Sequence, residues 1–295
     1  MPVYPVIGAS STLADLIDSL DSSSDVSSLP PVRVLREYQE RFLVQRFIQD
    51  NIEHKSVSLC RRGYRVVDAE GVATRVACDN AWLCAVCSPR KLSAFSSKAR
   101  EVISYSSSAL GFTLTQKQES GEALADALNR LNKSMTATTS GRAWTKLRST
   151  YGIVGLGYVI ELKHSPTGWH PHLHGFLVSD RDLTEEQASQ LALHFRRRWS
   201  QQSAGAAVSA QHVARVRGTD VENVTRYVQK DHPRYTTASA THRTVGDLLH
   251  DASRGDLEAL DLVQEVARAT TGRRRFSWTP KIIDRLQRSS LPHAA

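Results

Sequence analysis

The stretch "GWHPHLHGFLV" (residues 168–178) places His170, His172 and His174 at alternate positions of a segment that otherwise has the pattern of a buried strand. Side chains alternate between the two faces of a β-strand, so the three imidazoles share one face, while Leu173 points into a core on the other. Burying several imidazoles without partners is unfavourable. The pattern therefore predicts that these histidines bind a metal ion.

A carboxylate ligand is expected from the preceding strand, which contains "YVIELK". The two strands are separated by Ser-Pro-Thr-Gly, a turn sequence. If the hairpin turns at residues 166–167, Glu161 lies directly opposite His172 on the same face, and a slip of one residue would remove it. Imidazole and carboxylate together suit Mg²⁺, Mn²⁺ or Zn²⁺. The alternative is a glutamate near a sheet edge that pairs with Lys163 or Arg148.

All the cysteines of the chain lie in one short segment: Cys60, Cys78, Cys84 and Cys87. The Cys84-Ala-Val-Cys87 spacing lets one turn of backbone present two thiolates to a tetrahedral ion, and the other two cysteines would complete a four-sulfur site. Disulfides are not expected in a reducing cytosol. A structural Zn²⁺ is thus the leading interpretation, and unconnected thiols with one redox-active Cys-x-x-Cys are the alternative.

The formal net charge of +8 is unevenly distributed. Residues 1–30 contain four aspartates and no lysine or arginine, so the remainder carries a formal +12, with clusters such as Arg196-Arg197-Arg198. This favours a polyanion partner, although a solvated basic surface is equally compatible. No apolar run is long enough to span a membrane and no secretory signal begins the chain, so a cytoplasmic protein is expected.

Helical and strand patterns alternate along the chain. Helices are predicted for residues 32–55, 121–140, 183–199 (with a capping box that begins at Thr184) and 220–231, and strands for residues 110–116, 154–164, 169–179 and 209–218. Residues 232–270 are expected to be a mostly helical linker. The domains expected are a flexible acidic arm (1–31), a helical and zinc-binding segment (32–105), a central domain (106–240) and a helical basic segment (241–295).

The predicted helix with "RYVQKD" places Tyr227 and Lys230 three residues apart, so both face the same direction. A tyrosine hydroxyl becomes a useful nucleophile if a cation stabilises the phenolate and a metal polarises the phosphate that it attacks. Taken alone, Tyr-x-x-Lys is compatible with a packed aromatic beside a surface lysine.

Three segments, "FTLTQ" (residues 112–116), "HPHLHGFLV" (170–178) and "YVQK" (227–230), occur in the order of the motifs of HUH endonucleases. The chain resembles the one-tyrosine group of rolling-circle plasmid replication initiators over about residues 60–278, with a similar upstream Cys-x-x-Cys and a similar "GRRRFSW" near the end. The resemblance implies an α+β fold, in which a central antiparallel sheet has flanking helices and a small N-terminal zinc-binding lobe.

The resemblance also implies the activity. Tyr227, assisted by Lys230, would nick one strand of the plasmid double-strand origin, keep the 5′ phosphate as a phosphotyrosine and free a 3′ hydroxyl for synthesis. His172 and His174 would hold Mg²⁺ or Mn²⁺ with Glu161, and His170 is a further candidate. The expected partners are origin DNA, single-stranded at the nick, and a host helicase and polymerase in a bacterial cytoplasm.

One position departs from the pattern of some relatives, which carry a carboxylate one helical turn before the tyrosine. Here that residue is Asn223, so termination would need Glu222 or a second tyrosine such as Tyr235. An HUH relaxase or transposase, and a non-enzymatic zinc-containing nucleic-acid-binding protein, are the alternative functions. Candidates for gripping the DNA are aromatic and basic side chains, namely Trp169, Arg273, Arg274, Arg275 and Trp278.

Overall fold

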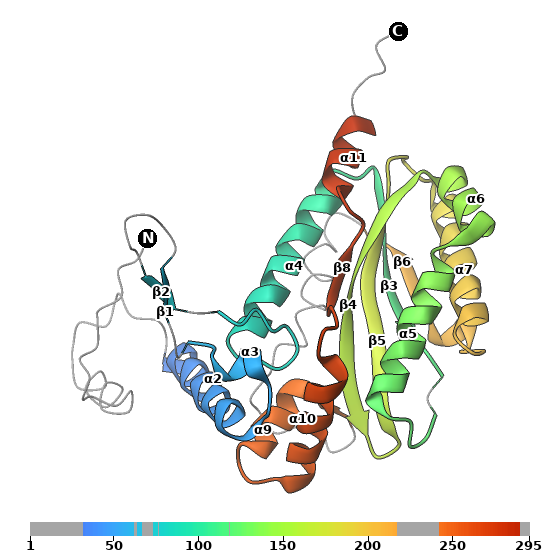
Figure 1. Ribbon diagram of the computed structural model, residues 1–295. Coiled ribbons are helices and arrows are strands. Elements are labelled where there is room, and N and C mark those ends of the chain that lie inside the picture. Colours follow the sequence, from blue (N-terminus) through green and yellow to red (C-terminus); the bar gives the residue numbers. More distant parts are fainter. Residues whose placement is uncertain are drawn as a thin grey trace.

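The centre of the fold is an antiparallel β-sheet with helices on both faces, an α+β architecture (Figure 1). The computed structural model describes residues 32–61, 64–66, 73–75, 77–117, 119–216 and 242–289. The acidic arm and the predicted helix over residues 220–231 lie outside these ranges. Within them, no helix combines the length and the apolar character needed to cross a membrane.

The six strands of this sheet follow the order β6-β3-β5-β4-β7, and β8 pairs with β4 as well. Every pairing is antiparallel. The longest neighbours, β4 and β5, form a hairpin and carry the "YVIELK" and "HPHLHG" sequences. The strands are β3 (Ser108–Thr115), β4 (Ile153–Ser165), β5 (Gly168–Ser179), β6 (His212–Arg215), β7 (Arg243–Thr244) and β8 (Phe276–Trp278).

One face of the sheet is covered by three helices, α5 (Leu124–Thr138), α6 (Gly141–Tyr151) and α7 (Glu185–Gln202). Leu173 and Leu177 of β5 belong to the core on this side, as the alternation in the sequence predicts. Apolar burial of this kind contributes about 1.5–3 kcal/mol for each fully buried leucine side chain.

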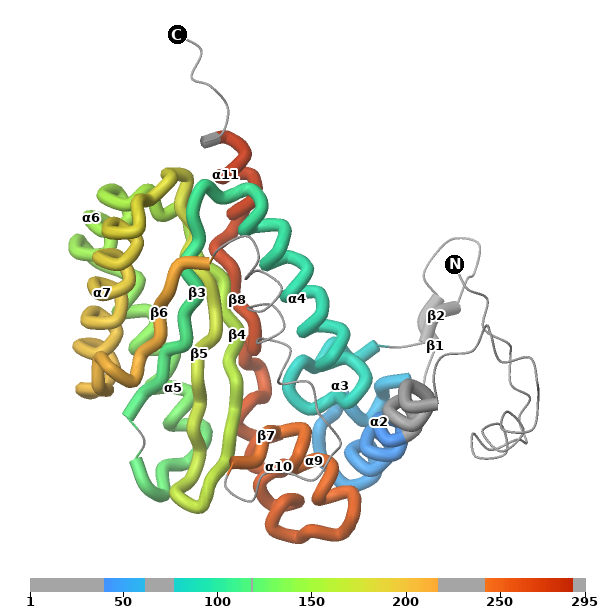
Figure 2. The backbone as a smooth tube through the Cα atoms, turned by 180° about the vertical axis from the view of Figure 1, so that it is seen from behind, coloured from blue at the N-terminus to red at the C-terminus, as the bar shows by residue number. Residues whose placement is uncertain are grey.

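The other face is covered over part of its length by α4 (Cys87–Ser104) and α11 (Ile282–Ser289), as Figure 2 shows. Phe176 of β5 packs with Leu92 and Phe95 of α4, and Val178 packs with Ile282 of α11. The three histidines are separated from Phe176 by even numbers of residues, so their side chains lie on the same face as Phe176, toward the other end of β5.

The remaining elements gather beside the hairpin end of the sheet (Figure 1). Helix α9 lies against α2, and α10 packs on both α9 and α5. These elements are α2 (Val32–Asn51), α3 (Lys55–Ser58), α9 (Val245–Ala252) and α10 (Leu257–Thr270). A separate two-stranded antiparallel hairpin is formed by β1 (Tyr64–Val66) and β2 (Ala73–Arg75).

The structure confirms the α+β class and the predicted elements that fall on described residues. The predicted capping box is present: the Thr184 side chain accepts a hydrogen bond from the Gln187 backbone, and the Gln187 side chain bonds back to Thr184. The strand predicted for residues 209–218 is shorter, because a 3₁₀ turn occupies Val208–Ala210. Helices α4 and α6 and strand β8 were not predicted.

Strand β8 lies along β4 where glycine makes room for it. A Cβ atom at Gly157 would lie 2.2 Å from the Trp278 ring, so a larger residue there would displace the indole. The ring also packs on Phe95 in a tilted arrangement, with centroids 4.8 Å apart. The "GRRRFSW" segment therefore contributes a strand and an aromatic wedge to the core between β4 and α4.

Candidate functional site

The β4–β5 hairpin places Glu161 directly across from His172, which confirms the predicted register. The pairing runs from the turn at Ser165↔Gly168 to Val159↔His174, so the strands are in register along the whole histidine segment. Glu161 and the histidines therefore share a face, and the Glu161 side chain is 10% exposed.

Glu161 is bonded on both of its carboxylate oxygens. Its Oε2 lies 2.7 Å from Nε2 of His174, and its Oε1 lies 3.0 Å from Nζ of Lys163. The pairing with Lys163 was one of the alternatives left open by the sequence, and here it coexists with the histidine contact. Although burial alone would raise it, the pKa of Glu161 is held well below its usual range by the hydrogen bond and charge of His174 and by Lys163. The carboxylate is thus ionised at neutral pH.

The second ring nitrogen of His174 is held by the neighbouring strand. Nδ1 lies 3.0 Å from Oγ1 of Thr113, which is the cross-strand partner of His174 in β3. A hydrogen bond at Nδ1 fixes the orientation of the imidazole ring and so the direction of its Nε2. It also determines the tautomer, and therefore which ring nitrogen can bind a metal. Sequence reasoning did not identify Thr113, although its place in "FTLTQ" was a signal.

His172 is half-buried and neutral. Burial lowers the pKa of His172 to about 4, so the imidazole carries no proton charge at neutral pH, which is the form that ligates metals. Its Nδ1 is buried without a hydrogen-bond partner among the described residues. Such an orphaned nitrogen is costly in a folded protein and indicates a missing ligand.

The ring of His170 lies parallel to the ring of His172, with centroids 6.5 Å apart. Its Nε2 lies 2.7 Å from Oγ of Ser165, and its ring meets that of His242 edge-on with centroids 5.9 Å apart. Burial and the neighbouring histidines lower its pKa. The structure thus brings His172 and His174 together with Glu161, and places His170 at the side of the group.

The donor set of Glu161, His172 and His174 fits a divalent cation chemically, because it offers one carboxylate and two imidazoles on one sheet face. The orphaned Nδ1 of His172 supports this fit. Glu161 and His174 are bonded directly to each other, and the ligand atoms of the three residues do not all lie within 4.8 Å of one another. In the described part of the chain, those of the four cysteines do.

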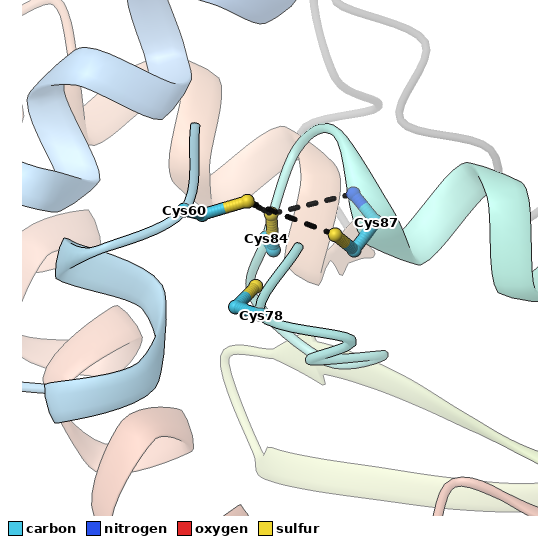
Figure 3. Close-up of side chains that lie close together, drawn as sticks. All are labelled: Cys60, Cys78, Cys84 and Cys87. Atoms are coloured by element: carbon cyan, nitrogen blue, oxygen red, sulfur yellow. Dashed lines mark hydrogen bonds between the residues drawn. The ribbon is translucent and has the colours of Figure 1, made fainter. Parts of the chain in front are cut away.

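The four cysteines form the second candidate site, and Figure 3 shows their sulfurs turned toward one another. The sulfur of Cys60, which follows α3, lies 3.6 Å from that of Cys84 and 3.7 Å from that of Cys87 at the start of α4. A disulfide would need about 2.05 Å. Four sulfurs around a tetrahedral Zn²⁺ at about 2.3 Å would lie about 3.8 Å apart, so the cluster could bind such a metal.

The cysteine site is deeply buried and supported by α2. Cys60 and Cys84 have no exposed surface, and the Gln45 side-chain oxygen accepts hydrogen bonds from Cys84 Sγ and from the Ala85 backbone. Hydrogen bonds from Cys78 and Cys84 lower the pKa of Cys87, which favours the thiolate that binds metals. Closed sites of this kind stabilise a fold rather than perform chemistry.

Arg275 connects the cysteine loop to the sheet. It is 6% exposed and donates hydrogen bonds to the carbonyls of Ile160 and Ala81 and to the hydroxyl of Ser88. Ile160 is the residue before Glu161, so the Arg275 side chain links the cysteine-containing segment to the strand that carries Glu161. Sequence analysis grouped Arg275 with the DNA-binding arginines and did not foresee these internal bonds.

The other residues predicted to grip DNA differ in exposure. Trp169 is 5% exposed and donates through Nε1 to Glu265 of α10. Arg273 donates to the Ala269 carbonyl, whereas Arg274 is exposed to solvent. Trp278 is partly exposed, with Lys98 Nζ 5.6 Å from the ring centroid. The predicted nucleophile and its neighbours lie outside the described residues, namely Tyr227, Lys230, Asn223, Glu222 and Tyr235.

Zinc analysis of the purified protein tests the cysteine site. We expect one zinc ion per chain, lost in the Cys84→Ser variant together with roughly 10 °C or more of thermal stability, because a structural zinc site supplies several kcal/mol of folding free energy. Leu59→Ser, at a 62% exposed position beside Cys60, is the matched control and should retain the metal. A zinc-free wild-type protein of undiminished stability would contradict the assignment.

The bond from Thr113 to His174 gives a second prediction. Thr113→Val keeps the side-chain shape but removes the hydroxyl, and should weaken Mn²⁺ binding in calorimetry by about 10–100-fold, the usual effect of losing an outer partner of a histidine ligand. Thr113→Ser restores the hydroxyl and should recover most of the affinity. Equal affinities for the valine variant and the wild type would show that Thr113 does not orient a ligand.

No protein-family model and no curated protein matches the chain. Among solved structures, the N-terminal nuclease domain of non-structural protein 1 of minute virus of mice is similar at 10% identity, with a TM-score of 0.21 over 48% of this chain and 70% of that one. That domain coordinates Zn²⁺ in its active-site pocket and recognises DNA at an origin of replication. A likeness of this extent does not establish a shared fold or activity, so the function of the present chain rests on its own residues.

Proposed function

We propose that the chain is a metal-dependent endonuclease that nicks one strand of a plasmid origin through a covalent phosphotyrosine and so starts rolling-circle replication. The observation that carries the proposal is the meeting of two sequence motifs: Thr113 of "FTLTQ" and Glu161 both contact His174 of "HPHLHG". These two motifs, followed along the chain by "YVQK" (residues 227–230), underlie the resemblance to the plasmid initiators.

Glu161, His172 and His174 would hold Mg²⁺ or Mn²⁺, and His170 takes second place because its Nε2 is bonded to Ser165. When bound, the cation would polarise a phosphodiester and stabilise the negative charge that develops on its oxygens. The residues themselves contribute a neutral imidazole, an ionised carboxylate and an oriented ring, and the bonds of Glu161 to His174 and Lys163 would be exchanged for the cation.

Tyr227 supplies the nucleophile in this proposal. Its phenolic oxygen attacks the phosphorus, the bond from phosphorus to the 3′ oxygen breaks, and that oxygen takes up the proton given by the tyrosine. The products are a 5′ phosphotyrosine and a free 3′ hydroxyl. Lys230 stabilises the phenolate. Because one phosphate ester replaces another, the bond energy is retained and the DNA ends can later be rejoined. Before that, a host polymerase would extend the 3′ hydroxyl while a host helicase unwinds the DNA.

Termination requires a group other than Asn223, because an amide cannot act as a general base. We assign this step to Glu222 or to Tyr235, both of which lie outside the described residues. The division into a zinc-binding segment (32–105), a nicking domain (106–240) and a basic C-terminal segment (241–295) is part of the same proposal.

The DNA strand would cross the part of the sheet face that α4 and α11 leave open. Arg274 and Lys98, which are exposed, can provide positive charge. The ring of Trp278 is packed against Gly157 and Phe95. The internal bonds of Trp169 and Arg275 support a positioning role for these two: Trp169 anchors the hairpin to α10, and Arg275 anchors the cysteine loop to β4.

A covalent adduct tests the proposal directly. Incubated with single-stranded fragments of its own replicon and Mn²⁺, the protein should gain the mass of a 3′ DNA fragment on the peptide that contains Tyr227. The Tyr227→Phe variant should form no adduct yet bind the same DNA, because only the nucleophilic oxygen is lost. Glu161→Gln should bind DNA and react much more slowly.

Three other outcomes would decide among the alternatives. An adduct on a different residue would overturn the assignment of Tyr227. Reaction with transfer origins or transposon ends, but not with a replication origin, would favour a relaxase or transposase. DNA binding without any nicking would leave only the third alternative, a non-enzymatic nucleic-acid-binding protein with a structural zinc ion. The cysteine cluster is the feature that supports this alternative.

A further inference from the structure

The sequence indicates Lys163 only as an alternative ion-pair partner of Glu161, yet its side chain lies beside the histidine site. It follows Glu161 by two residues in β4 and therefore shares its face, and its cross-strand partners are His170 on β5 and Thr244 on β7. Its Nζ is 3.0 Å from Glu161 Oε1. The lysine side chain is 34% exposed, against 10% for that of the glutamate. Lys163 therefore lies between the buried carboxylate and solvent.

The two partners of Glu161 differ in how easily they can move. His174 is 5% exposed, and its ring is fixed at both nitrogens by Glu161 and Thr113. Lys163 ends in a compact ammonium on a flexible four-carbon stem, and solvent already reaches it. A divalent cation can replace the Glu161 bond at Nε2 of His174 without moving the ring, which Thr113 still holds, whereas it repels the ammonium of Lys163. The lysine is therefore the side chain that moves away.

We propose that Lys163 is a substrate-binding residue, which is paired with Glu161 in the metal-free protein and transfers to a non-bridging oxygen of the scissile phosphate when a divalent cation takes its place. This inference rests on the proposed function and adds a second cation to it. An ammonium anchored on the metal-binding strand can donate to a phosphate oxygen, and the phosphate charge offsets the repulsion between ammonium and metal. No bond is made or broken by Lys163 itself.

Metal binding without DNA gives the first readout. Lys163→Met keeps the stem but removes the charge that competes for Glu161, so its Mn²⁺ affinity in calorimetry should rise by about two- to fivefold, the usual strength of a partly exposed ion pair. Lys163→Arg should stay near the wild type. Lys146→Met, which removes an exposed charge from α6 on the opposite face, is the matched control and should have no effect.

The second readout is the salt dependence of binding to a fluorescein-labelled oligothymidylate. With Mn²⁺ present, Lys163→Met should reduce the slope of log affinity against log salt by about 0.7, the value for one lost phosphate contact on a single strand. In EDTA the slope should equal that of the wild type, because Lys163 is then held by Glu161. Lys146→Met should show no such dependence on the metal.

The results separate this inference from the proposed function. Weaker Mn²⁺ binding by Lys163→Met, or a slope change that is the same with and without metal, would overturn the role of Lys163 and leave the endonuclease intact. A wild-type protein that binds no Mn²⁺ at this site would remove the proposed function and this inference with it. Normal unfolding midpoints for both lysine variants would confirm that neither result reflects misfolding.

Discussion

The contact between Glu161 and His174 depends on one constraint, the register of the β4–β5 hairpin. The side-chain period of a strand is two residues, so a slip of one would turn Glu161 into the apolar core that contains Leu173 and separate it from the imidazoles. The register is set at the turn, where Ser165 faces Gly168, and is maintained by leucines that can be buried only on the opposite face. Packing on one side of the sheet therefore determines the chemistry available on the other.

The segment that contains the four cysteines (residues 60–87) stabilises the position of the histidine site from a distance. Arg275 bonds to the loop between Cys78 and Cys84 and to Ile160 next to Glu161, and α4 begins at Cys87. The four sulfurs thus hold the start of α4, the helix that covers part of the sheet face on which the histidines lie. In this arrangement a structural ion would affect the proposed reaction only by keeping α4 and β4 in place. Its loss would lower the stability of the fold and would not remove a group that takes part in the chemical step.

Much of the site could be predicted from the sequence, because alternating strand patterns and a short turn determine which side chains share a face. Glu161 and His172 were placed by this reasoning alone. The rest depends on tertiary packing: α6 buries only Trp144 and Tyr151, too few for a clear apolar period, and β8 has three residues and exists because Gly157 admits Trp278. Similarly, charge counting cannot distinguish the buried Arg275 from the exposed Arg274.

The central claim, that Glu161, His172 and His174 form one cation site, is tested most directly by pulsed electron paramagnetic resonance of the Mn²⁺-loaded protein. Our account predicts couplings from imidazole nitrogens bound to the Mn²⁺, with one nitrogen lost in His172→Ala and another in His174→Ala. Bound Mn²⁺ with no nitrogen coupling, or with couplings unchanged in both variants, would contradict it.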